Sequence, residues 1–266
     1  VDYREITEKY AQISMENGAD IKLGTSFEDY WDPRTVGKNL ILETSKGVIE
    51  TKLTINCAGL YSDVVAKKMG VTPKLRIIPF RGEYYNIKPE KKDLVKGLIY
   101  PVPDPKFPFL GVHFTPNASK DGQLSIGPTA TIALGRENYR GLDAIEPSIA
   151  INSVTQLVKQ YITNSGNIRK YAHEQALLCF LPLMLKEAQK LVPALTLSDI
   201  EISEKVGIRA QLFNKELSKL ENDFICITQG TSTHILNSIS PAFTASFELG
   251  DLILDKANII ASRHAK

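Results

Sequence analysis

The chain has 266 residues, 43% of them hydrophobic, and its 32 basic and 30 acidic side chains leave a net charge of +2. This composition excludes a disordered or fibrous protein, and the balanced charge gives no field that would attract nucleic acid. The length allows one large or two smaller domains. The three cysteines, Cys57, Cys179 and Cys226, are widely spaced among apolar neighbours. That spacing predicts buried free thiols in a reducing compartment, without disulfides or a metal site.

The first quarter of the chain alternates between helical and strand patterns. Apolar residues spaced for one helix face, followed by a glycine stop, predict an amphipathic helix over residues 3–17. A short strand is expected over 19–23, a turn over 31–34, and a hairpin with arms at 39–44 and 48–51.

The stretch 53–64 joins a buried strand to the start of a helix. Its apolar residues end in Cys57-Ala58-Gly59, and Tyr61-Ser62-Asp63 leads into a helical pattern. Small residues at such a turn let a ligand approach the backbone, and the unpaired N–H groups of a helix start suit an anion or a polar cofactor edge. Most turns of this kind serve only packing, so the local pattern leaves both interpretations open.

The middle of the chain predicts a largely antiparallel sheet covered on one face by helices. Short strand patterns with Pro and Gly turns occupy residues 75–87, 97–100, 109–114 and 123–128. Four prolines between residues 101 and 108 exclude a helix there. Helical patterns over 148–161 and 172–192 are expected to cover the sheet.

The last part of the chain returns to strands and ends in a helix. Strands are expected over 200–202, 205–212 and 224–228, a loop over 229–233, and an amphipathic helix over 241–255. The loop segment 230–240 before that helix is predicted to direct backbone N–H groups towards a bound group.

Four stretches of the chain together resemble one enzyme family. The first, Asn56-Cys57-Ala58-Gly59-Leu60-Tyr61-Ser62-Asp63, is similar to the second flavin-contacting segment of FAD-dependent oxidoreductases related to D-amino-acid oxidase and glycerol-3-phosphate dehydrogenase. The others, at 80–85, 100–103 with 111–114, and 207–211, resemble the L-2-hydroxyglutarate oxidase/dehydrogenase branch of that family. The resemblance extends to about residue 251.

This resemblance implies an α/β (α+β) fold with two domains. Residues 1–74 would be the later part of a Rossmann-like FAD-binding domain, 75–205 a mostly antiparallel substrate-binding domain covered by helices, and 206–266 a return to the FAD-binding domain. Family members open with a Gly-x-Gly-x-x-Gly turn that binds the ADP half of FAD, and no such turn occurs in these 266 residues. The chain is therefore expected to be a fragment, or one half of a split flavoenzyme with a separate N-terminal FAD-binding polypeptide as partner.

Two arginines are candidates for binding a substrate carboxylate. The planar fork of Arg suits this task, because it meets a carboxylate with two parallel hydrogen bonds. Arg209 lies in an apolar strand and resembles the substrate-binding Arg of the family; the alternative is an ion pair with a nearby Glu. Arg81 is the second candidate, since L-2-hydroxyglutarate has two carboxylates, but pairing with Glu83 is an equal alternative.

Two of the four histidines match family segments. A single His is more often structural than catalytic, but His113 lies in an alternating strand and matches the family's Gly-Val-His-Phe, which makes it the preferred proton acceptor. His234 matches the loop that approaches the flavin pyrimidine ring and is expected to position substrate or cofactor. Tyr85 and Tyr100 are further candidates for the pocket lining.

The remaining site residues follow from the resemblance alone. As flavin neighbours it implies Cys57, Ala58, Gly59, Tyr61, Gly207, Leu236, Asn237 and Ser238. Asn237 and Ser238 are also explained locally as capping residues of the last helix. No metal-ligand spacing and no Gly-x-Ser-x-Gly elbow occurs in the sequence.

The expected function is FAD-dependent oxidation of a 2-hydroxy acid, L-2-hydroxyglutarate above others, with hydride transfer to the flavin. The alternatives are oxidation of glycerol 3-phosphate or an amino acid by the same architecture, and a non-catalytic subunit of a split flavoenzyme. No stretch has the length and apolarity of a transmembrane segment, so a cytoplasmic location is expected, with peripheral membrane association left open.

Overall fold

The structure, a computed structural model, describes residues 2–33, 39–71, 74–102, 111–117, 122–164 and 168–259. The chain forms two compact units: unit 1 comprises residues 1–22 and 80–209, and unit 2 comprises residues 23–79 and 210–266. This division places residues 1–22 with the central part of the chain, whereas the predicted domain bounds group them with residues 23–74. The assignment of the parts to cofactor and substrate binding stays a prediction.

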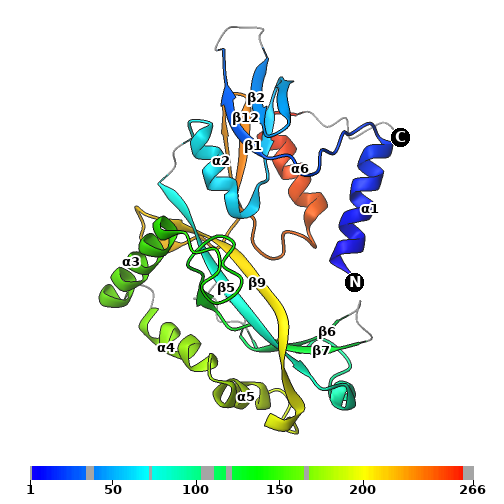
Figure 1. The fold of residues 1–266 in the computed structure, drawn as a ribbon, viewed down its shortest axis with the longest axis vertical. Coiled ribbons are helices and arrows are strands. Elements are labelled where there is room, and N and C mark those ends of the chain that lie inside the picture. Colours follow the sequence, from blue (N-terminus) through cyan, green and yellow to red (C-terminus); the bar gives the residue numbers. More distant parts are fainter. Residues whose placement is uncertain are drawn as a thin grey trace. The chain divides into compact units, whose positions relative to one another are not determined.

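Unit 1 combines strands of an antiparallel sheet with α-helices. Its elements are α1 (Tyr3–Glu16), β5 (Leu75–Ile87), β6 (His113–Pro116), β7 (Leu124–Gly127), β8 (Thr131–Ile132), α3 (Pro147–Thr163), α4 (Ile168–Leu178), α5 (Leu181–Gln189) and β9 (Ile200–Asn214), with short 3-10 helices at Pro89–Leu94 and Leu197–Asp199. The first residues of β5 and the last residues of β9 belong to unit 2. Figure 1 shows β5 and β9 side by side, with α3, α4 and α5 along one side of them.

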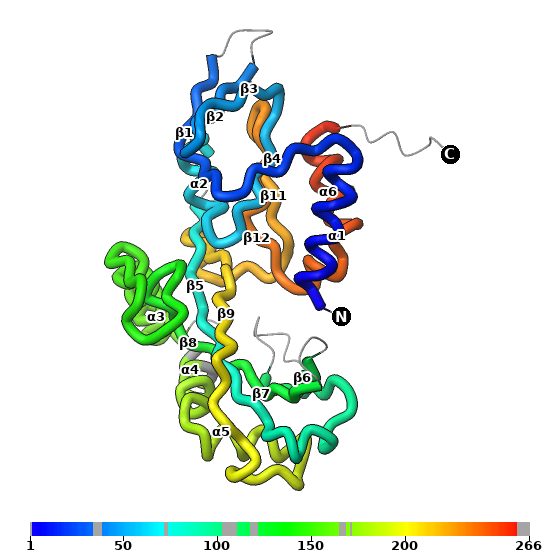
Figure 2. The backbone as a smooth tube through the Cα atoms, turned by 45° about the vertical axis from the view of Figure 1, so that its right-hand side comes forward, coloured from blue at the N-terminus to red at the C-terminus, as the bar shows by residue number. Residues whose placement is uncertain are grey.

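The sheet that contains these strands also includes β10 (Lys219–Leu220) of unit 2; its order is β10-β9-β5-β7-β6, and β8 pairs with β5 at its side. The pairs β5–β7 and β6–β7 are antiparallel, with Tyr85 opposite Ile126 and His113 opposite Gly127. This confirms the predicted α/β fold class with a mostly antiparallel, helix-covered sheet. Figure 2 shows β5 and β9 running side by side, with α5 beside the lower end of β9.

One face of this sheet forms the larger hydrophobic core. Side chains alternate between the two faces of a strand, and Ile87, Phe114, Leu124 and Ile126 all point to the same face. They pack there with residues of α4 and α5, among them Leu178, Met184 and Ala188. The helices are held on the sheet by the hydrophobic effect, because this face would otherwise expose a continuous apolar surface.

Substitution of Ile126 tests this core. Ile126 is fully buried, so Ile126→Val removes one methylene and leaves a small cavity, which is expected to lower the free energy of unfolding by about 1 kcal/mol. Ile202→Val makes the same chemical change at a side chain that is 85% exposed; there the change should stay within about 0.5 kcal/mol. Urea unfolding of both variants checks the assignment, and equal losses would contradict it.

Unit 2 contains two three-stranded sheets, short helices and the last α-helix. Its elements are β1 (Phe27–Trp31), β2 (Leu40–Thr44), β3 (Gly47–Thr51), β4 (Thr54–Asn56), a 3-10 helix (Gly59–Tyr61), α2 (Ser62–Lys68), β10 (Lys219–Leu220), β11 (Ile225–Gln229), β12 (Ser232–Asn237) and α6 (Ser246–Lys256). The sheet orders are β1-β2-β3 and β11-β12-β4. The pair β12–β4 is parallel, with His234 opposite Asn56.

Several predicted elements differ from those in the structure. No strand forms over 19–23; the strand lies at Phe27–Trp31, overlapping the predicted turn, because those residues find a pairing partner in β2. The predicted strand 97–100 is reduced to a single bridge between Ile99 and Phe114. Residues 103–110, which include most of the proline-rich segment and the start of the predicted strand 109–114, lie outside the described residues.

The helix predicted over 172–192 is two helices. α4 ends at Leu178 and α5 begins at Leu181, with a proline in its first turn. Proline cannot donate the backbone hydrogen bond that a continuous helix needs at that position. The two strands predicted at 200–202 and 205–212 are, in contrast, one continuous strand, β9.

The predicted loop over 229–233 and 230–240 is mostly a strand. β12 occupies Ser232–Asn237 because it pairs on one side with β11 and on the other with β4. The last helix begins at Ser246, not at residue 241, and its N-cap is Ala245. Asn237 and Ser238 therefore do not cap it.

Candidate functional site

The predicted substrate residues of unit 1 lie on two opposite faces of the sheet. The face opposite the helices carries His113, whose strand neighbours Val112 and Phe114 belong to the core. We call this the polar face and define it by Tyr84, Asn86, His113, Ser125, Lys205, Gly207 and Arg209. Asn86 and Ser125 are joined across β5 and β7 by a hydrogen bond from Ser125 Oγ to Asn86 Oδ1.

His113 is buried on the polar face and held in a fixed orientation. It is 8% exposed, its ring stacks on Tyr100 with centroids 4.3 Å apart, and its Nδ1 lies 2.9 Å from the carbonyl oxygen of Gly111. A carbonyl oxygen only accepts hydrogen bonds, so Nδ1 carries the proton in the neutral ring and Nε2 has the lone pair. Burial lowers the pKa of His113, Lys205 lowers it further, and the Gly111 contact partly opposes both. The ring is thus a neutral proton acceptor around pH 7.

A glycine opposite His113 leaves room for the aromatic ring of Tyr84. Gly127 pairs with His113 and has a φ of +144°, and a Cβ there would lie 2.9 Å from Cδ1 of Tyr84. Any other residue would therefore displace the ring of Tyr84, which contacts the ammonium group of Lys205.

Lys205 lies on the polar face near His113, and the sequence patterns did not predict it there. Its Nζ lies 4.4 Å from the centre of the Tyr84 ring, and its charge acts on His113. The residue as a whole is exposed, but partial desolvation of the ammonium lowers the pKa of Lys205. The only sequence signal was its position in β9, an even number of residues before Arg209.

Arg209 lies further along β9 on the polar face. Positions two apart along a strand share a face, so Gly207 and Arg209 lie on the side that carries Lys205. Arg209 is partly buried, whereas Gly207 is exposed, and a Cβ added to it would meet nothing within 4 Å. His113 and Arg209, the two predicted catalytic residues, are therefore on one face of one sheet.

Arg81 and Tyr85 lie on the opposite, helix-covered face. Nε of Arg81 is 3.2 Å from Oε1 of Glu83, so the alternative pairing predicted from the sequence is present. The N–H is not aligned for a hydrogen bond, and Nε and Nη1 have no hydrogen-bond partner within the described residues. Tyr85 packs against the core, and both Glu83 and Tyr85 line a cavity of about 560 Å³ that also includes Cys179. Arg81 and Tyr85 are thus not grouped with His113.

In unit 2, the turn 57–61 follows β4 and is organised by Asn56. The buried Asn56 donates from Nδ2 to the carbonyl oxygen of Ser62 at 2.8 Å, and its Oδ1 accepts from the backbone N–H of Ala58 at 3.1 Å. These two bonds from the buried side chain of Asn56 fix the backbone of the turn. Cys57, Ala58 and Gly59 are exposed, and Gly59 has a φ of +53°.

The turn has features that suit a bound cofactor. Open space lies above Gly59, where an added Cβ would meet nothing within 4 Å. At the start of β4 the buried Oγ1 of Thr54, and at the start of α2 the buried Oγ of Ser62, have no hydrogen-bond partner in the part of the chain that the structure describes. Tyr61 is 40% exposed. The helix that follows has only seven residues, so the exposed turn is a stronger feature than the helix dipole.

His234 is a structural residue of the same sheet. It is fully buried, Nδ1 contacts Asn56 Nδ2 at 3.0 Å and Nε2 contacts Ser232 Oγ at 3.0 Å. Burial lowers the pKa of His234. Both ring nitrogens therefore contact buried protein groups, and no atom of the His234 side chain is accessible to a substrate. The contact with Asn56 orients the amide that holds the turn 57–61.

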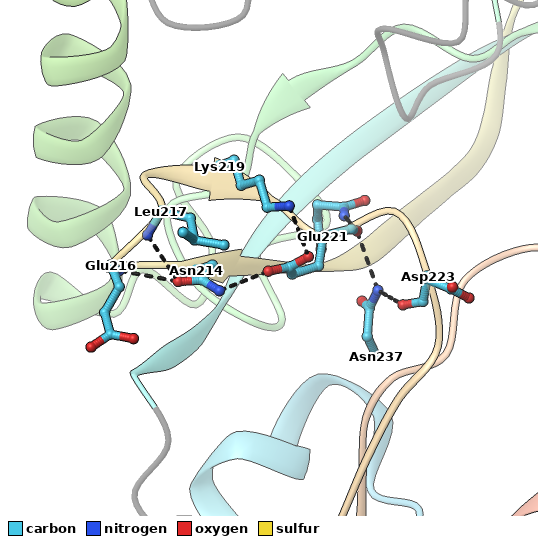
Figure 3. A network of polar contacts seen from close by, with 8 residues as sticks. Asn214, Glu216, Leu217, Lys219, Glu221, Asp223 and Asn237 are labelled. Carbon is cyan, nitrogen blue, oxygen red and sulfur yellow. Dashed lines mark hydrogen bonds and ion pairs between the residues drawn. The ribbon is translucent and has the colours of Figure 1, made fainter.

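Leu236 and Asn237 are also buried, and Ser238 is exposed. Leu236 belongs to a core cluster with Ala66 and Ile77. Asn237 donates from Nδ2 to the carbonyl oxygens of Glu221 and Asp223, at 3.2 and 2.6 Å, as Figure 3 shows. Glu221 follows the hairpin formed by β9 and β10. Asn214 of β9 stabilises this hairpin, because its Nδ2 donates to Oε1 of Glu221 at 2.8 Å. Asn237 thus anchors the end of β12 to the hairpin formed by β9 and β10.

The cysteines are more exposed than predicted. All three are free; Cys57 and Cys179 are exposed, and Cys226 is partly buried. The apolar neighbours in the sequence misled the prediction because Cys57 and Cys179 fall at the ends of elements, after β4 and between α4 and α5.

The family model of the FAD dependent oxidoreductases (DAO) matches residues 1–255, and the chain belongs to this family. FAD is the cofactor of the family.

The chain is also similar to individual members of this family and to solved structures. It is 35% identical over 275 residues to the mitochondrial L-2-hydroxyglutarate dehydrogenase of Bos taurus, covering 96% of the chain and 57% of that protein. It is 37% identical over 278 residues to the Homo sapiens enzyme of the same name, with coverage of 96% and 57%. Among solved structures, the FAD-bound L-alpha-glycerophosphate oxidase of Mycoplasma pneumoniae matches with a TM-score of 0.60 and 17% identity, covering 96% of the chain and 56% of that structure.

The chain thus spans 57% of the length of these two curated relatives. Within the described residues, no helix combines the length and apolarity needed to cross a membrane. Among those same residues, no group of three or more His, Cys, Asp or Glu side chains is placed to hold a metal ion.

Proposed function

We propose that the chain is the substrate-binding portion of an FAD-dependent oxidoreductase that oxidises a 2-hydroxy acid, with L-2-hydroxyglutarate as the substrate. The observation that carries this proposal is the arrangement of His113 and Arg209 on the polar face of one sheet. A neutral, oriented imidazole and a guanidinium are the two groups that a 2-hydroxy acid requires from the protein. The similarity to L-2-hydroxyglutarate dehydrogenases supports the choice of acid.

Each of the two residues has a separate task. Arg209 binds the carboxylate next to the reacting carbon and orients it through two parallel hydrogen bonds. Nε2 of His113 accepts the proton of the substrate hydroxyl, while the contact of Nδ1 with Gly111 keeps the ring in the tautomer that can do so. When bound, FAD supplies the acceptor for the hydride that leaves the same carbon.

The residues that would hold FAD in unit 2 are those of the exposed turn, Cys57, Ala58, Gly59 and Tyr61, together with Ser238. The side chains of Leu236 and Asn237 are buried, and Nδ2 of Asn237 is already bonded to the carbonyl oxygens of Glu221 and Asp223, so their proposed contacts with a cofactor run mainly through the backbone. The ADP half of FAD needs a Gly-rich turn, which these 266 residues do not contain. That part of the site is therefore proposed to come from a further FAD-binding polypeptide segment.

A visible absorption spectrum tests the proposal. The purified chain is combined with a polypeptide that carries the Gly-rich FAD-binding segment, and spectra are recorded anaerobically before and after L-2-hydroxyglutarate is added. A flavin band at about 450 nm that bleaches on addition is the expected result. Glycerol 3-phosphate and an L-amino acid are the comparison substrates. A flavin band that none of these compounds bleaches would favour a non-catalytic subunit over an enzyme.

We place the chain in a reducing compartment. Its three cysteines are free and two of them are exposed, which is the pattern of proteins kept under reducing conditions. The Bos taurus and Homo sapiens relatives are mitochondrial enzymes. The cytoplasm, which the sequence predicts, and the mitochondrion are therefore the two reducing compartments that we consider.

A further inference from the structure

The polar face carries a second cation that the proposed reaction does not use. Lys205 lies on β9 four residues before Arg209, on the same face. Its Nζ rests 4.4 Å from the centre of the Tyr84 ring, and an ammonium in that position keeps N–H groups directed away from the ring. We propose that Lys205 binds a second carboxylate and makes the site selective for 2-hydroxy acids that are dicarboxylates. This inference rests on the proposed function and names its substrate class.

The spacing of the two cations fits a five-carbon diacid. Four residues of strand separate their Cα atoms by about 13 Å. In an extended five-carbon diacid, four C–C bonds place the carboxylate carbons roughly 5 Å apart. An ion-pair contact of up to about 4 Å at each end gives a span of about 13 Å between the two cationic groups, which matches the Cα separation if the two side chains stand roughly parallel on their strand. The long side chains of Lys205 and Arg209 can adjust this distance further, so a five-carbon diacid can contact both cations at once.

The environment of Lys205 favours an anionic partner. Desolvation lowers the pKa of Lys205, whose ammonium lies over the Tyr84 ring. The positive charge of Lys205 in turn contributes to the lowered pKa of His113. A carboxylate bound to Lys205 would relieve both effects, since an opposite charge within a few ångströms stabilises a cation. The site is accessible because Lys205 is exposed.

Arg81, the second cation predicted from the sequence, does not fit this role. It lies on the helix-covered face and is 17% exposed, with Nε 3.2 Å from Glu83 Oε1. A carboxylate bound to Arg81 would be on the other side of the sheet from His113. The geometry therefore replaces Arg81 by Lys205 as the second carboxylate ligand.

Binding measurements on the chain itself test the inference without any flavin. Glutarate and valerate have the same length, but only glutarate has two carboxylates, and the NMR signals of the His113 ring report their binding. Wild-type chain is expected to bind glutarate about 10- to 100-fold more tightly than valerate, the range of one hydrogen bond to a charged group. Lys205→Gln should abolish this preference, and Lys205→Arg, which keeps the charge, should retain most of it.

Two further readouts separate a ligand from a structural residue. Loss of the Lys205 charge should raise the pKa of His113 in the unliganded chain, because that charge lowers it. The matched control is Lys215→Gln, which removes a charge from an exposed turn just after β9 and should change neither the preference nor that pKa. An equal loss of glutarate and valerate binding in Lys205→Gln would overturn the inference, as would a selective loss of glutarate in Arg81→Gln.

Kinetics distinguish failure of this inference from failure of the proposed function. In the flavin-loaded protein, Lys205→Gln should raise KM for L-2-hydroxyglutarate about 10- to 100-fold and leave KM for L-2-hydroxyvalerate unchanged. If the wild-type protein oxidises neither acid but still prefers glutarate through Lys205, the dicarboxylate site stands and only the oxidation is wrong. If both acids are oxidised with equal KM by wild type, Lys205 is not a carboxylate ligand.

Discussion

His113→Asn is expected to lower turnover of the flavin-loaded protein by roughly two to four orders of magnitude. Asn matches the polarity and approximate shape of the imidazole, but it cannot accept a proton around neutral pH. KM should change little, because the carboxylate of the substrate is bound elsewhere. Steady-state kinetics with L-2-hydroxyglutarate measure both parameters.

The pH profile gives His113 an independent signature. The neutral ring is the active form, so activity is present above the pKa of His113 and is lost as the pH falls through it. Burial lowers this pKa below its ordinary value of 6.5, and the acid limb of kcat/KM should therefore lie below pH 6.5. His113→Asn should remove that limb.

His173 provides the matched control. It is an exposed histidine of α4 whose Nε2 contacts the hydroxyl of Tyr161 at 2.8 Å, and His173→Asn should leave both the turnover and the acid limb in place. A raised KM with unchanged turnover in His113→Asn would assign His113 to substrate positioning instead of proton transfer.

Arg209→Lys should cost about 2–4 kcal/mol in transition-state stabilisation. Lysine keeps the positive charge but loses the planar fork, so the substrate carboxylate is no longer held by two parallel hydrogen bonds. The corresponding loss in kcat/KM is roughly 30- to 1,000-fold. Kinetics of the variant with L-2-hydroxyglutarate and with L-2-hydroxyvalerate should show the loss for both acids, because both carry the carboxylate next to the hydroxyl.

This common loss distinguishes Arg209 from Lys205, whose replacement should affect only the diacid. Arg4→Lys is the control for the chemical change itself, since the Arg4 side chain is 86% exposed on α1 and kcat/KM should not change. Unchanged turnover of Arg209→Lys with every 2-hydroxy acid would remove Arg209 from the mechanism.

Much of the local structure could be predicted from short-range patterns. The alternation in 75–87 and the hairpin around residues 45–47 appear as β5 and as the pair β2–β3, because period-two hydrophobicity and turn residues are properties of a few neighbouring positions. The predictions failed where pairing between distant segments determines the secondary structure. β12 forms from a segment rich in Thr and Ser whose local pattern predicts a loop, because both of its edges are occupied by partners from elsewhere in the chain.

The sequence by itself determined the family, the Cys57-Ala58-Gly59 turn after a strand, and His113 and Arg209 as the candidate catalytic pair. These depend on residue identity and on the order of motifs along the chain. Only the tertiary structure decided that Arg81 lies on the helix-covered face, that His234 is enclosed between Asn56 and Ser232, and that Lys205 stands beside His113. The face on which a strand residue lies relative to residues of other strands depends on pairing and register, and these are set by contacts between segments that are not neighbours in the sequence.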